Sequence, residues 1–172
     1  MIPTITTERL YLRPFTLTDI PAMHQILSGK DVLRYFPTTQ APSLAGVERM
    51  IQWILNHWQE RGYGLWALAH KETNALLGRC GLSYIAETAE VEVDFILDRA
   101  YWGQGLATEA GRSAMQFGFD ELGLSTIIGI VHPENLASQR VLRKIGLQFA
   151  EEAEYFGMAC YKFVGERPSL AK

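Results

Sequence analysis

The sequence has few cysteines, and the two it has lack the spacing of a metal or redox site. Cys80 and Cys160 lie far apart and form no CxxC pair, and the four histidines are scattered. We therefore expect no bound metal. One disulfide between the two cysteines is an alternative, but we favour two small buried side chains.

Long apolar runs and an excess of positive charge are also absent. No apolar stretch approaches the roughly 18 residues of a membrane-spanning helix, so we expect no membrane partner. Residues 1–10 lack the basic and apolar regions of a secretory signal peptide, and we expect a cytoplasmic protein. The formal net charge is −3 without a basic stripe, which argues against nucleic acid as the main partner.

The composition is that of a globular protein. Of 172 residues, 48% are hydrophobic and 20% are charged, a balance typical of a folded domain with a sizeable core. No segment is of low complexity, no repeat is visible, and no linker rich in Pro, Gly or Ser divides the chain. We therefore predict a single domain over residues 1–172.

The first part of the chain predicts one strand followed by helices. Residues 9–13 form a short strand that ends at Pro14. We expect a first helix that Thr18 or Asp19 caps and Gly29 stops. Another helical turn is expected over residues 30–36.

The clearest helix begins after Ser43 and ends at Gly62. Its apolar residues recur at helical spacing and form one stripe, which consists of Val47, Met50, Ile51, Ile54, Leu55 and Trp58. Such a stripe predicts a helix that packs on a core.

The rest of the chain predicts strands and then alternating helices and strands. Three antiparallel strands are expected at 64–71, 76–85 and 91–97. The later elements, in order, are a loop at 101–105, a helix ended by Gly123, a strand at 126–131, a helix from Asn135 to Gly146, and strands at 147–153 and 158–164. We predict an α/β fold of mixed α+β character, with a mostly antiparallel mixed sheet and helices on both faces. The segment 91–146 should supply its parallel pair.

The segment Trp102–Thr108 is the most informative motif. It carries Gly103 and Gly105 between a strand and a helix, where the backbone can approach a ligand closely. Unpaired N–H groups and the helix dipole make such a turn an anion site suited to a pyrophosphate. By itself the motif is weak, since two glycines in a loop are often only structural.

Two other phosphate motifs fit this segment poorly. A P-loop needs a Lys-Ser/Thr pair that is absent here. A dinucleotide-binding fingerprint needs a third glycine, and Thr108 holds that position in a loop that lies in the middle of the chain.

The segment 135–147 is the second motif. Asn135 has the position of a helix N-cap, whatever else it does. Ser138 lies one turn inside the helix, where solvent or a backbone carbonyl could satisfy its hydroxyl.

Taken together, these motifs resemble the GNAT superfamily of N-acetyltransferases, and within it the RimJ/RimL type of ribosomal-protein N-terminal acetyltransferases. The resemblance covers nearly the whole chain, through the segments 7–14, 92–97, 101–110, 135–138 and 144–147. Several motifs in the same order make a chance match improbable.

The resemblance implies that the strand ending at Leu97 and the strand at 126–131 splay apart and hold acetyl-CoA in the gap. Asn135 would reach the pantetheine arm from one side. Backbone groups on the other side would pair with it, namely those of Phe95, Ile96 and Leu97. Amides of the glycine loop would hold the pyrophosphate, namely those of Gly103, Gln104, Gly105, Ala107 and Thr108.

The sequence departs from the superfamily pattern at two positions. Trp102 stands where Gln or Arg usually opens the phosphate motif, a feature that the RimJ/RimL type shares. Arg143 stands where many members have a Tyr that acts as general acid. The resemblance to the RimJ/RimL type implies Ser138 as the acid for the CoA thiolate, with water as the alternative.

Glu92 and Asp94 share one face of their strand because strand residues alternate. Two carboxylates this close would couple, and one pKa could rise. Glu92 matches an acid of the family and is the expected general base, acting through a water. Asp94 stands where the subgroup often has Gly; either side chain could instead be a solvated strand residue.

The resemblance thus implies direct acetyl transfer in a ternary complex. A backbone N–H near Ile96 would stabilise the oxyanion. Neither cysteine belongs to the acetyl-CoA motif, so an acyl-enzyme is not expected.

The acceptor would be a primary amine: a protein N-terminus, which the subgroup resemblance favours, a polyamine, an amino acid or a drug-like amine. Candidate acceptor residues are the segment 34–37 and the helix of Trp53 and Trp58, although Trp58 belongs to the apolar stripe. A non-catalytic acyl-CoA-binding GNAT-like domain and a dinucleotide-binding oxidoreductase are the competing readings. A homodimer is left open.

Overall fold

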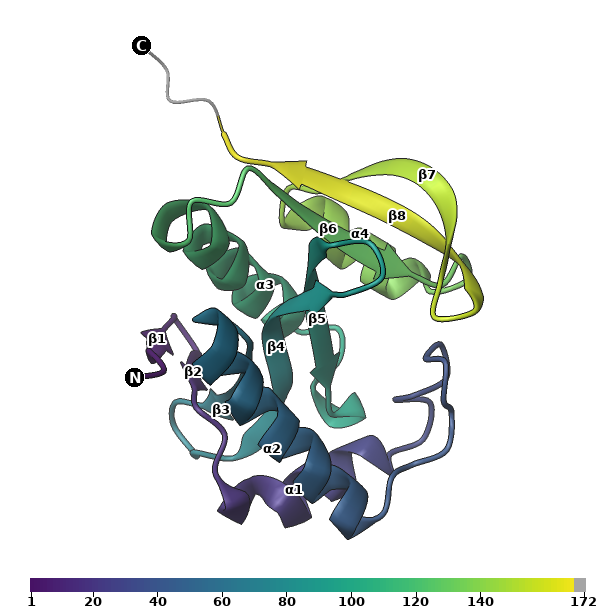
Figure 1. Ribbon diagram of the computed structural model, residues 1–172. Coiled ribbons are helices and arrows are strands. Elements are labelled where there is room, and N and C mark those ends of the chain that lie inside the picture. Colours follow the sequence, from purple (N-terminus) through teal and green to yellow (C-terminus); the bar gives the residue numbers. More distant parts are fainter. Residues whose placement is uncertain (169–172) are drawn as a thin grey trace.

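The computed structural model describes residues 1–168, and residues 169–172 of the predicted domain lie outside the described residues. Its strands form one eight-stranded sheet in the order β1-β2-β3-β4-β5-β6-β8-β7 (Figure 1). The strands are β1 (Ile5–Thr6), β2 (Leu10–Arg13), β3 (Leu65–His70), β4 (Leu76–Ile85), β5 (Glu90–Leu97), β6 (Thr126–Val131), β7 (Gln148–Tyr155) and β8 (Met158–Glu166). The helices are α1 (Ile20–Leu27), α2 (Leu44–Arg61), α3 (Leu106–Gln116) and α4 (Leu136–Lys144).

The sheet is antiparallel except where β5 meets β6. Strands β2 to β5 form the predicted meander. β5 pairs with β4 along its whole length, but within residues 1–168 it pairs with β6 only at Glu92 and Ile128. β6 turns instead to β8, with which it pairs from Thr126 to Val131. The two parallel strands therefore splay apart beyond Glu92, as predicted.

Helices cover both faces of the sheet. On one face, the Nη1 atom of Arg79 on β4 lies 3.5 Å from Sδ of Met50 on α2. On the other face, a Cβ added to Gly118, in the helical turn Phe117–Glu121 that continues α3, would lie 3.0 Å from Cδ1 of Leu82. Since residues 79 and 82 of one strand point to opposite faces, α2 and α3 lie on opposite sides of β4.

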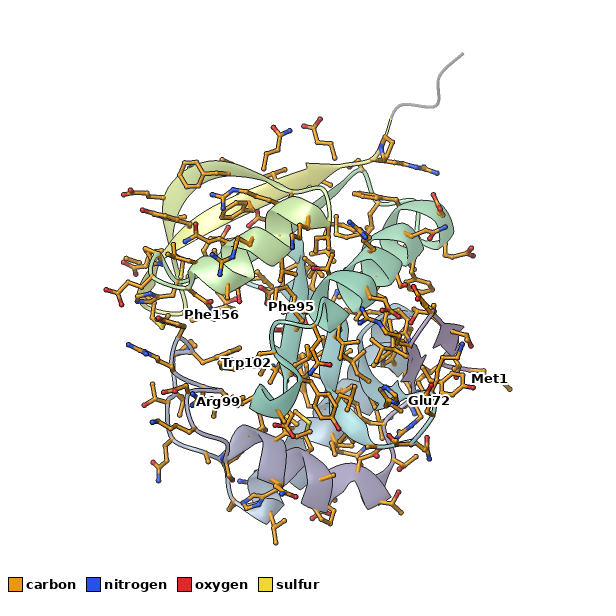
Figure 2. The ribbon with its side chains drawn as sticks, turned by 180° about the vertical axis from the view of Figure 1, so that it is seen from behind. Met1, Glu72, Phe95, Arg99, Trp102 and Phe156 are labelled. Carbon is orange, nitrogen blue, oxygen red and sulfur yellow. The ribbon has the colours of Figure 1, made fainter. Side chains whose placement is uncertain are left out.

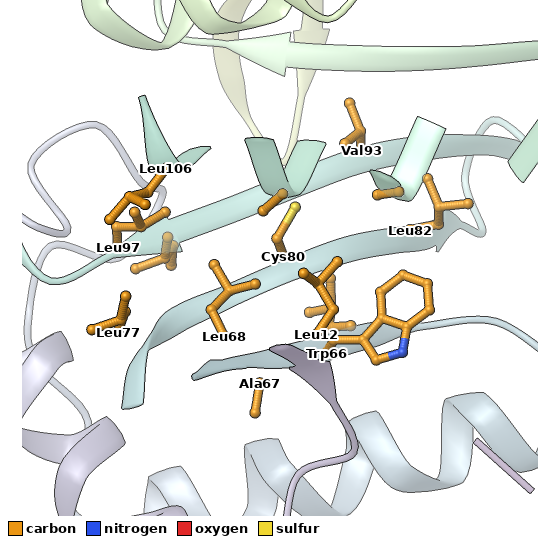
Figure 3. Close-up of a cluster of buried hydrophobic side chains, with 14 of the residues drawn as sticks. Leu12, Trp66, Ala67, Leu68, Leu77, Cys80, Leu82, Val93, Leu97 and Leu106 are labelled. Carbon is orange, nitrogen blue, oxygen red and sulfur yellow. The ribbon is translucent and has the colours of Figure 1, made fainter. Parts of the chain in front are cut away.

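Buried aliphatic and aromatic side chains fill the space between the sheet and its helices. Leu12, Trp66, Leu68 and Leu82 are fully buried in this core (Figure 3). Burial of each such side chain stabilises the fold by roughly 1.5–3 kcal/mol. Cys80 belongs to the same cluster, and both cysteines are buried and free, so the expected burial is confirmed and the disulfide is not formed.

Helix α2 has the predicted start, stop and stripe. Oγ of Ser43 accepts a hydrogen bond from the Gly46 N–H at 3.1 Å. Gly62 ends the helix in the left-handed region with φ 75°, a conformation that glycine adopts without strain. Trp58 is buried, and its indole N–H donates to the Leu65 carbonyl at 3.0 Å. None of the helices within residues 1–168 is long and apolar enough to cross a bilayer.

One local prediction was wrong and another held only in part. Residues 30–36 form successive turns and not a helix, because Asp31 has φ 65° and the backbone hydrogen bonds span three residues, as from Arg34 N–H to the Asp31 carbonyl. Asp19 is the N-cap residue of α1, as predicted, but its side chain makes no capping hydrogen bond. Its carboxylate accepts from the Thr16 N–H at 2.8 Å and pairs with Arg13 at 2.8 Å.

Candidate active site

The splayed end of β5 presents free backbone groups to the gap beside β6. The Asp98 N–H donates to the Leu77 carbonyl at 2.7 Å, and Arg79 pairs with Ile96. Because backbone groups alternate in direction along an antiparallel strand, those of Ile96 face β4, while those of Phe95 and Leu97 face the gap. A Cβ at Gly78 would collide with the Ile96 carbonyl oxygen, which agrees with this assignment.

Of the three predicted backbone partners, Phe95 and Leu97 therefore have the direction that a ligand in the gap requires. Ile96 does not, and the N–H group next to it that faces the gap is that of Phe95. The Leu97 carbonyl already accepts the indole N–H of Trp102 at 2.9 Å, which ties the glycine loop to the end of the strand.

The glycine loop lies at the start of α3, where the sequence predicts an anion site. Gly103 and Gly105 have φ values of 75° and 78°, and Gly105 is the N-cap. The Glu109 N–H donates to the Gly105 carbonyl, so the N–H groups of the first turn before it have no partner within the helix. The helix dipole places a partial positive charge at the same point.

The predicted loop residues differ in their position. Ala107 and buried Thr108 line the gap together with the two glycines and Trp102. Gln104 does not line it. Its side chain donates to the Ala100 carbonyl at 3.2 Å, and its own carbonyl accepts from Nη1 of Arg9 at 2.8 Å.

Helix α4 begins at the opposite wall of the gap. Oδ1 of Asn135 accepts from the Ser138 N–H at 3.1 Å, which confirms the N-cap prediction. This hydrogen bond leaves the Nδ2 group of Asn135 as a donor for a ligand. Ser138 is half-buried and lines the gap.

A cavity of about 530 Å³ lies between the glycine loop, the end of β5 and α4. Figure 2 shows this side of the molecule, with Phe95 and Trp102 on it. Free backbone donors, a helix N-terminus and glycines without a Cβ are together suited to an extended ligand with a pyrophosphate. The residues therefore fit the acetyl-CoA that the sequence resemblance implies.

A second cavity of about 320 Å³ adjoins the first. It contains Glu92, Asp94 and Arg79 from the sheet face that α2 covers, and Phe156 in the turn between β7 and β8 also lines it. The two cavities share one wall, which consists of Tyr35, Phe36, Phe95, Asn135 and Ser138. This shared wall is where a donor in the first cavity would meet an acceptor in the second.

Glu92 has an altered acidity in this position. Burial, with a smaller contribution from the negative charge of Asp94, raises its pKa to about 8, and Arg79 opposes the shift. Asp94 forms an ion pair with Arg79 at 2.9 Å, so it is not a solvated strand residue. With a pKa near neutral pH, a fraction of the Glu92 side chains is ionised, and this carboxylate form is a stronger base than an ordinary one. It can therefore accept a proton from an ammonium group.

Other candidates lie away from both cavities. Trp58 belongs to the core, and Trp53 is 50% exposed and lies beside His57. Arg143 packs over the ring of Phe163 at 5.1 Å. Trp53 and Trp58 therefore line neither cavity, whereas Tyr35, Phe36 and Pro37 of the predicted segment 34–37 line the second one.

Sequence reasoning missed the contribution of Arg79 and of the β7–β8 turn. A charged residue inside the apolar run of β4 was the available signal for Arg79. No comparable signal marked Tyr155, Phe156, Met158 and Cys160, which only the path of the last two strands brings to Glu92. No group of three or more His, Cys, Asp and Glu side chains within residues 1–168 is arranged to hold a metal ion.

Comparison with known proteins agrees with this geometry. The family model for the Acetyltransferase (GNAT) domain matches residues 9–148. An uncharacterized N-acetyltransferase, YoaA of Bacillus subtilis (strain 168), is 32% identical over 149 residues, which cover 86% of this chain and 84% of the relative. Spermidine N(1)-acetyltransferase of Escherichia coli (strain K12) is 27% identical over 83% of this chain and 74% of the relative.

Solved structures have the same fold. The acetyltransferase from Agrobacterium tumefaciens str. C58 superposes with a TM-score of 0.84 at 26% identity, covering 95% of this chain and 94% of that one. RimL, a ribosomal L7/L12 alpha-N-protein acetyltransferase in complex with coenzyme A, gives a TM-score of 0.78 at 19% identity over 96% and 97%. This chain therefore belongs to the GNAT acetyltransferase family and is an acetyl-CoA-dependent N-acyltransferase.

Proposed function

We propose that the protein transfers an acetyl group from acetyl-CoA to a primary amine by direct attack in a ternary complex. The observation that carries the proposal is the shared wall of the two cavities. It supports a donor thioester on the side of Phe95 and Ser138 and an acceptor amine on the side of Glu92.

In this mechanism the chain positions both reactants and moves protons. Glu92 takes a proton from the ammonium group, directly or through a water, so that the amine is neutral. The amine nitrogen then forms a bond to the acetyl carbon as the carbon–sulfur bond breaks. The Phe95 N–H stabilises the negative charge on the acetyl oxygen. The amine loses its second proton to solvent, and Ser138 supplies a proton to the thiolate while its own oxygen regains one from solvent.

The backbone groups of Phe95 and Leu97 and the Nδ2 group of Asn135 hold the pantetheine arm in this proposal. The amides of Gly103, Gly105, Ala107 and Thr108 hold the pyrophosphate. Gln104 acts through its carbonyl, which fixes the loop to Arg9. We further propose that residues 1–172 form one domain.

Relatives suggest different acceptors. The RimJ/RimL resemblance suggests a protein N-terminal α-amine, and a relative is named for spermidine. Both acceptors carry a primary amine, so the proposed transfer to a primary amine holds for either of them. A homodimer is compatible with the proposal and is not needed for it.

Release of free thiol from acetyl-CoA with a panel of primary amines tests the proposal. We expect amine-dependent thiol release, none without an amine, and a loss of about 100-fold in Glu92→Gln. Glu152→Gln on the exposed face of β7 is the matched control and should keep full activity. A burst of thiol without amine would contradict direct transfer, and full activity of Glu92→Gln would remove Glu92 from the mechanism.

A further inference from the structure

The second cavity holds one carboxylate that no neighbouring side chain balances. Asp94 is neutralised by Arg79, whose Nη2 atom lies 2.9 Å from its carboxylate, and both side chains are largely buried, with 14% of Arg79 and 19% of Asp94 exposed. Glu92 lies beside this pair on the same face of β5 and has no ion-pair partner of its own within residues 1–168. Once Glu92 is ionised, the three side chains together carry a charge of −1.

The remaining polar side chains of the cavity add no further carboxylate to Glu92 and the paired Asp94. The ring of His132 stacks on Tyr35 with centroids 5.1 Å apart, and its Nδ1 atom accepts from the Glu134 N–H. The hydroxyl of Tyr155 donates to Glu90, which lies outside the cavity and pairs with Lys162. The cavity therefore has a place for one positive charge.

Apart from Cys160, and Asn135 and Ser138 on the wall shared with the first cavity, the rest of the lining is apolar and the space is small. Its aromatic and aliphatic side chains come from the 35–37 segment, β6, α4 and the last hairpin, and they are Tyr35, Phe36, Pro37, Ile130, Leu142, Phe156 and Met158. The volume of about 320 Å³ corresponds to roughly ten water molecules at about 30 Å³ each. Such a space suits a compact apolar group.

We propose that the acceptor is a small primary monoamine with a compact apolar or aromatic body, whose ammonium group faces Glu92 and whose body packs between Phe36 and Phe156. This inference rests on the proposed function and narrows its acceptor. A polyamine and a peptide α-amine are the two classes that it excludes as preferred substrates.

The charge and polarity of the wall oppose both excluded classes. A second ammonium group of a polyamine would lie near the Arg79 guanidinium or among apolar side chains, and like charges brought together in a binding site repel each other. A peptide would bring amide groups next to the same apolar side chains, where an amide without a hydrogen-bond partner is unfavourable.

The test compares kcat/KM for pentylamine, cadaverine, phenethylamine and trialanine with the full chain and acetyl-CoA. Pentylamine and cadaverine differ only by the second ammonium group. We expect pentylamine to exceed cadaverine by about tenfold or more, which is 1.4 kcal/mol, and phenethylamine to exceed trialanine. Equal or better turnover of cadaverine or trialanine would overturn the inference and leave the proposed function intact. No turnover of any amine, with acetyl-CoA still bound, would defeat the proposed function itself.

Charge variants at the ion pair give a second readout. Arg79→Gln leaves Asp94 unbalanced, so the preference for pentylamine over cadaverine should fall by about tenfold. Arg79→Lys keeps the charge and should keep the preference, and Asp94→Asn should increase it. An unchanged preference in folded Arg79→Gln and Asp94→Asn would overturn the inference; if these variants do not fold, the preference of the unaltered protein decides.

Discussion

Arg9 and Glu109 form an ion pair, with 2.7 Å between Nε and Oε2. Arg9 directly precedes β2, and Glu109 lies in the first turn of α3. The same carboxylate accepts from the backbone N–H of Arg9 at 2.7 Å and from the hydroxyl of Thr7 at 2.6 Å. Nη1 of Arg9 donates to the Gln104 carbonyl at 2.8 Å. Arg9 thus connects the start of α3 with the glycine loop in front of it.

Glu109→Gln should therefore weaken acetyl-CoA binding. The glutamine side chain of this variant cannot form an ion pair with Arg9 and has one acceptor oxygen in place of two. Arg9 is then less firmly positioned, and its hydrogen bond to the Gln104 carbonyl weakens. We expect KM for acetyl-CoA to rise about tenfold, with a smaller change in kcat and a stability loss of about 1–3 kcal/mol. Glu121→Gln, at an exposed position in the helical turn Phe117–Glu121 after α3, is the control and should leave the KM for acetyl-CoA unchanged. An unchanged KM for acetyl-CoA in Glu109→Gln would show that the pair does not position the loop.

Gly105→Ala should damage the anion site through backbone strain. Gly105 has φ 78°, and the nearest atom to an added Cβ is Nη2 of Arg9 at 3.6 Å, so conformation and not space opposes the change. The strain costs about 1–2 kcal/mol. Gly123→Ala, at φ 68° with no neighbour within 4 Å, should lose similar stability without losing acetyl-CoA affinity. Equal effects of both variants on affinity, measured by calorimetry, would argue against the anion site.

Asn135→Asp should separate the two roles of Asn135. The carboxylate can still cap α4 by accepting from the Ser138 N–H, and a negative charge suits a helix N-terminus. It has no Nδ2 donor for the pantetheine arm. We expect near-normal melting temperature with weaker acetyl-CoA binding, whereas Asn135→Ala should lose both, with about 1 kcal/mol from the cap. Normal acetyl-CoA affinity in both variants would confine Asn135 to capping.

The acidity of Glu92 predicts a specific pH dependence of stability. Its pKa in the folded protein is about 8, above the ordinary 4.5. Between these values the folded state holds a proton that the unfolded state has lost, so the contribution of Glu92 to the free energy of unfolding falls as pH rises through this window. Glu92→Gln has no group that titrates at this position, so this decrease in the free energy of unfolding with rising pH is absent from the variant.

The melting temperature of Glu92→Gln should therefore rise relative to that of the unaltered protein as the pH increases from about 5 to 9, by an amount that corresponds to a few kcal/mol at most. Scanning calorimetry of both proteins over this range measures the difference, in which other titrating groups cancel. A difference independent of pH would mean that Glu92 is already ionised at neutral pH.

Much of the fold followed from local patterns in the sequence. Three features depend on residues that are close in the sequence, and all three were predicted. They are the apolar stripe of α2 between Ser43 and Gly62, the meander, and the N-cap of α4 at Asn135. The turns at 30–36 were not, because the positive φ of Asp31 leaves no sign in an otherwise helix-compatible segment. The short β1 strand was also missed, since it depends on pairing with β2.

The candidate site divides in the same way. The glycine loop and Glu92 lie in contiguous motifs, so the sequence could indicate them. The direction of the Ile96 backbone depends on the register with β4, and the partnership of Asp94 with Arg79 depends on two strands lying side by side. The aromatic turn at Tyr155 and Phe156 reaches the site only through the crossover that places β8 beside β6.

The most direct test of the account is the pH profile of kcat/KM for the unaltered protein and Glu92→Gln, with two primary amines of different basicity. If Glu92 is the general base, the unaltered protein should show an inflection near pH 8 that is the same for both amines. In Glu92→Gln this inflection should disappear and the rate should fall about 100-fold. An inflection that moves with the amine alone, and that persists at full rate in Glu92→Gln, would contradict the account.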